Sequence, residues 1–203
     1  MPELVTRPLN TDTWDAFAAL VERHNGVWGG CWCMAFHAKG AGCGKDEAPD
    51  HRRQKETLVR RGETHSTLVF DGACCIGWCQ FGRPGELPRI KSSRAYEAGE
   101  PTPADWRITC FFVDKARRNE GVAAIALEGA LSEIGTLGGG RVESFPEDTA
   151  DRKVSASFLH NGTLEMFERS GFETDYLIGK HRWLVHTNIE QATNPSGSGH
   201  DIL

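Results

Sequence analysis

The most constraining feature of the sequence is a strand, a helix and a second strand that follow one another in its second half. The apolar, β-branched run ITCFFV, Ile108 to Val113, is typical of a buried strand. Residues 119–137 carry apolar side chains at helical spacing, and residues 141–145 form another short strand-like run behind three glycines. Because two strands joined through a helix lie parallel in one sheet, the chain is predicted to be a mixed α/β protein.

The start of this helix has the character of an anion site. The segment DKARRNEGVAA places glycine and alanine where the helix begins, directly after the first strand. Unpaired N–H groups and about half a positive charge gather at such a point, which suits a pyrophosphate. Gly121 and Ala123 lack the bulk that would exclude it, and Arg118 can add a bidentate contact. Taken alone, the same pattern also fits a helix that simply packs on a sheet.

The remaining elements complete one folding unit. Asp71-Gly72 separates two strand-like runs and favours a tight hairpin turn, and the proline-rich segment 82–105 reads as a long loop with helical turns around Arg94. A single domain is expected over residues 1–186, followed by a disordered tail over 187–203. The other expected elements are strands at 4–7, 67–70, 73–81, 172–178 and 181–185, and helices from about residue 10 to 26, 50–61 and 163–170.

Composition narrows the class of protein. The net charge of -5 argues against a nucleic-acid partner, and no apolar run is long enough to cross a bilayer. The first residues lack the pattern of a secretory signal, so a cytoplasmic location with reduced cysteines is expected. A homodimer is left open.

Two motifs and the order of elements resemble the GNAT superfamily of acetyltransferases. The segment RNEGVA, Arg118 to Ala123, resembles the acyl-CoA loop of that superfamily, which reads Gln or Arg, x, x, Gly, x, Gly or Ala. The segment MFERSGF, Met166 to Phe172, resembles its later signature, in which a helix ends in an aromatic residue, three residues and Gly-Phe. The resemblance covers residues 4–186. It implies a central, mostly antiparallel sheet with flanking helices and one parallel pair of strands that splay apart.

The resemblance also implies a function, namely transfer of an acetyl group from acetyl-CoA directly to an amine acceptor. No metal is expected to take part. The backbone of Phe111 to Val113 would bind the pantetheine arm, and the amides of residues 119–124 would bind the pyrophosphate. The expected cofactor contacts are Phe111, Phe112, Val113, Arg118, Asn119, Glu120, Gly121, Val122, Ala123, Ala124, Asn161 and Phe167.

Candidate catalytic residues follow from the same comparison. A lysine-like amine has a pKa near 10.4, so roughly one molecule in a thousand is neutral at pH 7 and a base is useful. Glu143 is the candidate base, although a structural glutamate on a half-exposed strand fits the sequence as well. Phe167 stands where many relatives carry a tyrosine that protonates the leaving thiolate. The CoA thiolate could leave unaided, or Ser144, His160 or Tyr176 could replace that acid. Alternatively, the protein could be an acyl-CoA-binding regulatory module with little activity.

The segment between the first two expected helices is rich in glycine, cysteine and tryptophan. In GNAT proteins this region lines the acceptor pocket, so the resemblance implies a wall that includes Trp28, Trp32, Met34 and Phe36, although aromatic residues here fit a plain core as well. Zinc ligation by Cys31, Cys33, His37 and Cys43 is disfavoured because the C-x-C spacing is poor, and buried thiols are expected instead.

Overall fold

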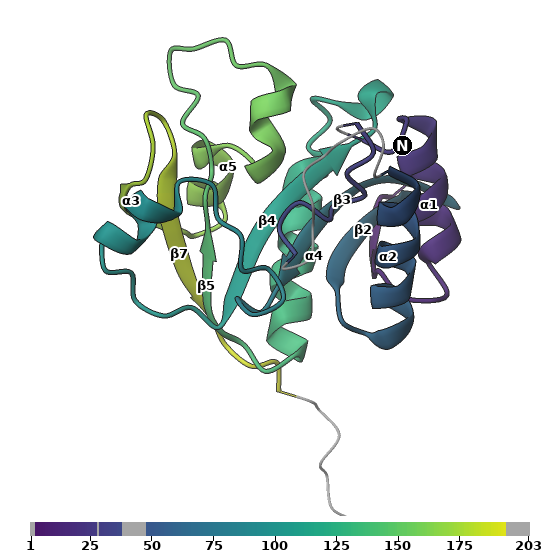
Figure 1. The fold of residues 1–203 in the computed structure, drawn as a ribbon, viewed down its shortest axis with the longest axis horizontal. Coiled ribbons are helices and arrows are strands. Elements are labelled where there is room, and N and C mark those ends of the chain that lie inside the picture. The colour runs from purple at the N-terminus through teal and green to yellow at the C-terminus, as the bar shows by residue number, and fades with distance from the viewer. Residues whose placement is uncertain (1–2, 28, 38–47, 194–203) are drawn as a thin grey trace, which may run out of the picture.

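The structure is a computed structural model that describes residues 3–27, 29–37 and 48–193. The strands of this described part form one seven-stranded sheet (Figure 1). They are β1 Val5–Pro8, β2 His65–Asp71, β3 Cys74–Gly82, β4 Trp106–Val113, β5 Gly140–Ser144, β6 Glu173–Leu177 and β7 Trp183–Ile189. The helices are α1 Trp14–Arg23, α2 Ala48–Arg61, α3 Ser93–Ala98, α4 Val122–Thr136 and α5 Leu164–Arg169, with 3-10 turns η2 Lys115–Arg117 and η3 Ala156–Asn161.

The order of strands across the sheet is β1-β2-β3-β4-β5-β7-β6. Every neighbouring pair is antiparallel except β4 and β5, which are parallel. The predicted hairpin of β2 and β3 is present, but its turn is one residue later than expected, at Gly72 and Ala73, because Asp71 still pairs with Cys74; Gly72 has a φ of 58°. The predicted α/β class with one parallel pair in a mostly antiparallel sheet is therefore confirmed.

Two apolar layers hold the sheet, one on each face. The layer under α4 includes Phe81, Ile108 and Phe111, whereas the layer under α1 includes Trp78, Cys110 and Phe112. Neighbouring residues of one strand thus divide between opposite layers, as the pleat requires. In Figure 1, α4 lies behind the central strands and α2 lies in front of β2. Among the described residues, no helix has the length and apolar character needed to cross a membrane.

Helix α4 approaches the sheet closely because small residues face it. Its predicted apolar stripe of Val122, Ala126, Ala130 and Ile134 is buried. A Cβ atom on Gly129 would lie 2.6 Å from Thr67 Cγ2. Glycine at this position therefore lets the helix backbone rest directly on β2.

Most expected boundaries differ from the structure by a few residues, and two of these differences have a clear physical reason. Helix α4 begins at Val122 and not at Asn119, because Asn119 and Gly121 have φ values of 64° and 78°, outside the helical region. Strand β7 extends to Ile189, past the expected end at 185, because Thr187 to Ile189 pair with Val142 to Gly140 of β5. The expected disordered tail over 187–203 therefore starts too early, and residues 194–203 lie outside the described part.

Candidate active site

The parallel strands β4 and β5 separate after a short paired stretch. They pair from Trp106 to Ile108 on β4, opposite Val142 to Ser144 on β5. One residue further along β4, the Nδ2 of Asn161 donates a hydrogen bond of 2.7 Å to the carbonyl oxygen of Thr109. A side chain from η3 thus occupies the place where strand pairing would have continued. The strands splay here, as the sequence predicted.

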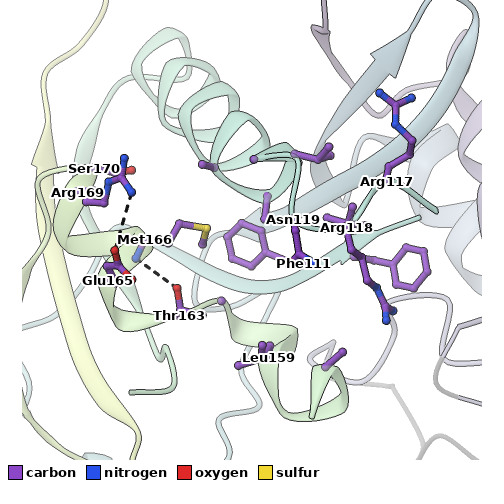
Figure 2. A pocket seen from close by; sticks show the side chains of 18 of the residues that line it. Phe111, Arg117, Arg118, Asn119, Leu159, Thr163, Glu165, Met166, Arg169 and Ser170 are labelled. Atoms are coloured by element: carbon purple, nitrogen blue, oxygen red, sulfur yellow. Dashed lines mark hydrogen bonds and ion pairs between the residues drawn. The ribbon is translucent and has the colours of Figure 1, made fainter. Parts of the chain in front are cut away.

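A cavity of about 610 Å³ opens beside this splay (Figure 2). It lies between the end of β4 and the start of α4 on one side, and η3 and α5 on the other. The predicted cofactor contacts that line it are Phe111, Phe112, Val113, Arg118, Asn119, Gly121, Val122, Ala123 and Ala124. The remaining lining residues are Arg117, Glu128, Ala156, Leu159, Gly162, Thr163, Glu165, Met166, Arg169 and Ser170.

The start of α4 presents unpaired donors to this cavity. Gly121 is the N-cap, in the left-handed conformation, and no side chain caps the helix. Its carbonyl accepts from the N–H groups of Ala124 and Ile125, so the preceding N–H groups of Val122 and Ala123 have no acceptor within the helix. A Cβ atom on Gly121 would meet nothing within 4 Å. The site is therefore open, electropositive and suited to a phosphate group.

Two consecutive arginines on the loop before α4 have different surroundings. Arg117 binds the carboxylates of Asp71 and Glu120. Arg118 makes no ion pair with any residue that the structure describes, and it lines the cavity. Figure 2 shows the two side chains pointing in opposite directions. Arg118 is thus the arginine that can meet an anionic ligand.

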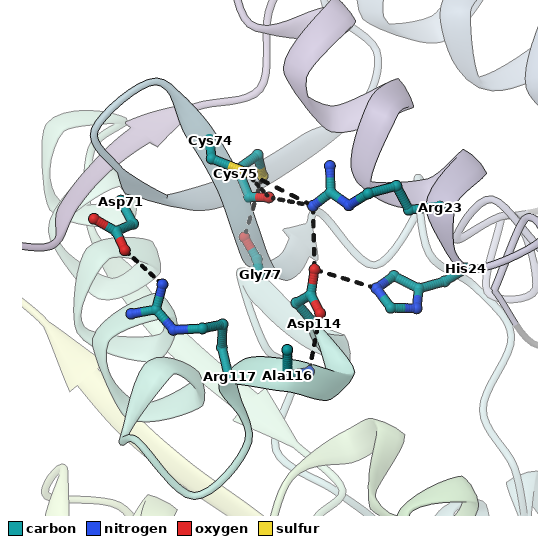
Figure 3. A network of polar contacts seen from close by, with 9 residues as sticks. All are labelled: Arg23, His24, Asp71, Cys74, Cys75, Gly77, Asp114, Ala116 and Arg117. Atoms are coloured by element: carbon teal, nitrogen blue, oxygen red, sulfur yellow. Dashed lines mark hydrogen bonds and ion pairs between the residues drawn. The ribbon is translucent and has the colours of Figure 1, made fainter.

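Asp114 fixes the position of this loop (Figure 3). Its carboxylate accepts hydrogen bonds from Arg23 Nη2 at 3.1 Å and from the N–H of Ala116 at 3.0 Å, and it lies 3.3 Å from His24 Nε2. Burial alone would raise the pKa of Asp114, but these donors outweigh it and the pKa is lowered. The ionised carboxylate therefore anchors the end of β4 to the last turn of α1.

Glu143, the predicted base, is enclosed in a buried ion pair. It is 2% exposed, and its Oε1 accepts from Arg107 Nε at 2.7 Å and contacts Arg107 Nη2 at 2.6 Å. Its Oε2 accepts from the Tyr96 hydroxyl at 3.0 Å. Both oxygens already have donors, and Glu143 does not line the cavity. Glu143 thus joins Tyr96, in segment 83–105, to Arg107 on β4, and its role as a base stays a prediction.

Two of the predicted substitutes for the missing acid, Ser144 and His160, lie in unfavourable settings. Ser144 is fully buried, and its hydroxyl donates to the carbonyl oxygen of Ile108. Burial and the nearby charges of Lys91 and Arg182 lower the pKa of His160 to about 4. His160 is therefore neutral at pH 7, which does not suit an acid, and its ring packs near Phe36 at 6.1 Å between centroids.

Three predicted cofactor contacts lie elsewhere. Phe167 is fully buried behind the cavity, with its ring against Phe111 and Phe172 at 5.9 and 4.8 Å. Asn161 supports Thr109, and the Glu120 carboxylate binds Arg117. None of the three lines the cavity.

The expected acceptor wall is only partly brought together. Trp32 packs on Trp14 in the core, Met34 lines a second cavity beside α2, and Phe36 contacts His160. Trp28 and Cys43 lie outside the described residues. Of the residues described, no group of three or more His, Cys, Asp or Glu side chains could hold a metal ion, and no disulfide joins the six described cysteines.

Sequence reasoning missed the far wall of the cavity. Leu159 of η3, Met166 of α5, and Gly162 and Thr163 between these two elements supply it. The MFERSGF motif located this helix but not the face that it presents. Tyr96 and Arg107 were also missed, since nothing local in the sequence marks either as a partner of Glu143.

Comparison with known proteins identifies the fold. No protein-family model and no curated protein sequence matches the chain. The structure is similar to that of mosquito arylalkylamine N-acetyltransferase like 5b, with a TM-score of 0.53, 13% identity, and coverage of 92% of this chain and 100% of that one. It is also similar to a putative acetyltransferase of the GNAT family from Desulfovibrio desulfuricans, with a TM-score of 0.50, 14% identity, and coverage of 92% of this chain and 99% of that one. A third similar structure is the histone acetyltransferase HPA2 and related acetyltransferase from Corynebacterium glutamicum, with a TM-score of 0.50, 12% identity, and coverage of 95% of this chain and 98% of that one. The chain therefore has the GNAT acyltransferase fold.

Proposed function

We propose that this protein is an N-acetyltransferase that moves an acetyl group from acetyl-CoA directly to an amine. The observation that carries the proposal is the cavity at the start of α4, where uncapped backbone N–H groups and Arg118 converge beside the splayed strands. The fold shared with acetyltransferases supports it. The acceptor amine is a small molecule or a protein amine.

The residues of the cavity fit acetyl-CoA. The N–H groups of Val122 and Ala123 would bind the pyrophosphate, and Arg118 would pair with a phosphate oxygen. The open backbone of β4 from Phe111 to Val113 would guide the pantetheine arm toward the splay. The chain would then act mainly by orienting the acceptor amine toward the thioester, an effect that can supply several kcal/mol of the barrier reduction.

The mechanism must account for the proton that the acceptor amine carries at pH 7. Bringing a lysine-like amine to its neutral form at pH 7 costs about 4 kcal/mol. Glu143 has both oxygens occupied, and His160 is neutral but a weak base because of its lowered pKa. We infer that the amine enters neutral, or loses its proton to solvent as it enters. Turnover should therefore rise with pH up to the pKa of the acceptor.

The adjacent residues Arg117 and Arg118 allow the proposed binding of coenzyme A to be tested. Arg118→Glu should weaken coenzyme A binding by about 10- to 100-fold, since it replaces a charge-assisted contact by repulsion. Gly121→Glu should have a similar effect, because it places bulk and negative charge at the open N-cap. Arg117→Gln is the matched control, because the Arg117 guanidinium is already bound to Asp71 and Glu120, and this variant should leave affinity within about threefold.

Calorimetry with coenzyme A and circular dichroism would be run on the three purified variants. Equal affinity of Arg118→Glu and the wild type would remove the main support for the proposal. Thiol release from acetyl-CoA across a panel of amines then tests catalysis. Binding without turnover for any acceptor would favour the regulatory module, which the buried phenyl ring of Phe167 and the occupied carboxylate of Glu143 also fit.

A further inference from the structure

A second arginine faces Arg118 across the cavity at the start of α4. Arg118 belongs to the loop before α4, whereas Arg169 is the last residue of α5, and both line the cavity. Figure 2 shows the two side chains on opposite sides, with Met166 between them. Ser170, the next residue along the chain, lines the same wall as Arg169. Cationic side chains therefore lie on both walls of the cavity, and the binding of a pyrophosphate at the start of α4 uses only one of them.

Arg169 is held much less firmly than Arg117. The Nη1 of Arg169 lies 3.9 Å from Glu165 Oε1, and the two side chains are 81% and 78% exposed. An exposed ion pair at such a distance contributes little to stability. In contrast, Arg117 lies 2.5 Å from the carboxylate of Asp71 and 2.7 Å from that of Glu120. Arg169 can therefore turn to an anion in the cavity without breaking a strong ion pair.

Two carboxylates, Glu128 and Glu165, also line the cavity. Glu128 comes seven residues after Gly121, which places it roughly 10 Å further along the axis of α4. At that distance it does not compete with a phosphate for the N–H groups at the start of the helix. Glu165 does compete, because it is the ion-pair partner of Arg169. A phosphate that binds Arg169 must displace the Glu165 carboxylate.

Coenzyme A has two separate anionic groups. Its pyrophosphate is attached to the 5′ carbon of the ribose, and a phosphate monoester is attached to the 3′ carbon of the same ribose. A monoester of this kind carries a charge of about −1.5 to −2 at pH 7. If the start of α4 and Arg118 bind the pyrophosphate, the monoester is left to another cation. Among the described residues that line the cavity, Arg169 is the remaining arginine once Arg117 is set aside as ion-paired.

We propose that Arg169 binds the 3′-phosphate of coenzyme A, and that Glu165 competes with this phosphate for the guanidinium. Two N–H groups of the planar guanidinium donate to two oxygens of the phosphate. The protein then distinguishes coenzyme A from 3′-dephospho-coenzyme A, which lacks only that phosphate. This inference rests on the proposed use of acetyl-CoA and adds a selectivity for one form of the cofactor.

Calorimetry with both ligands tests the proposal, at low ionic strength where exposed charges are screened least. The wild type should bind coenzyme A about three- to tenfold tighter than 3′-dephospho-coenzyme A. Arg169→Gln should bring the two affinities within about twofold, because it weakens the binding of coenzyme A alone. Glu165→Gln should act in the opposite direction and tighten the binding of coenzyme A alone by about two- to threefold, because it removes the competing carboxylate.

Two further variants separate this effect from others. Arg60→Gln is the matched control, because Arg60 also follows its glutamate partner, Glu56, by four residues, and no described residue of α2 lines the cavity. Both affinities and their ratio should stay at the wild-type values. Arg118→Gln should weaken both ligands by a similar factor and leave their ratio unchanged, since both ligands carry the pyrophosphate.

Three results would overturn the assignment of Arg169 while leaving the binding of coenzyme A intact. They are equal affinity of the wild type for the two ligands, a ratio that survives in Arg169→Gln, and a ratio that is lost in Arg118→Gln instead. Failure of the wild type to bind either ligand would refute the proposed function itself, and this inference with it. Circular dichroism of each variant shows whether a change in affinity reflects a loss of fold.

Discussion

Replacing Glu143 by glutamine separates a structural role from a catalytic one. The side chains of Arg107 and Glu143 are 6% and 3% exposed, so solvent does little to screen their charges. Glutamine keeps the shape and one acceptor oxygen but leaves the Arg107 guanidinium buried without an anion, with the neutral Leu87 carbonyl as its other partner. Breaking a buried pair in this way costs about 3 to 5 kcal/mol. We therefore expect Glu143→Gln to lower the free energy of unfolding by that amount.

Urea denaturation at pH 7, followed by tryptophan fluorescence, measures this loss as a lower midpoint with an unchanged slope. The double variant Arg107→Met/Glu143→Gln removes both charges and should be less destabilised than the sum of the two single variants by more than about 1 kcal/mol. A loss below about 1 kcal/mol in the single variant would refute the reasoning. If turnover then fell and the pH–rate profile changed, Glu143 would be the base after all.

Two further predictions concern buried groups. Phe167→Tyr buries a hydroxyl in an apolar cluster, so denaturation should show a loss of about 1 to 3 kcal/mol in the free energy of unfolding. Turnover should change by less than about tenfold. A much larger gain in turnover would show that the missing phenol is what limits catalysis. Burial raises the pKa of Glu133 from 4.5 to about 7, although a hydrogen bond from Thr67 opposes it. The folded state then binds the extra proton, so stability should be greatest below about pH 4.5 and fall as pH rises to about 7. Thermal unfolding at pH 5 and pH 8 should show this difference in the wild type, and a difference that persists in Glu133→Gln would assign it to another group.

Local patterns predicted the elements that depend on local sequence. The strand that ends at Val113, the helix behind Gly121 and the hairpin at Gly72 each follow from residues close in sequence. The partners of Glu143 do not, because Arg107 and Tyr96 lie 36 and 47 residues away along the chain. The orientation of Phe167 could not be predicted from local sequence either, since it depends on how α5 packs against Phe111. Local sequence thus placed nine of the expected cofactor contacts around one cavity, whereas it gave no sign of what surrounds Glu143 and Phe167.

The place of β7 in the sheet has a consequence for how the chain is made. Strand β5 pairs with β4 on one side and with β7 on the other, and β7 is the last of the seven strands to be synthesised. Until Trp183 to Ile189 have emerged from the ribosome, the outer edge of β5 has unpaired backbone groups in the middle of the future sheet. An open edge of this kind can pair with a strand of another chain. Nascent chains that stall before β7 are therefore the species expected to aggregate or to recruit chaperones.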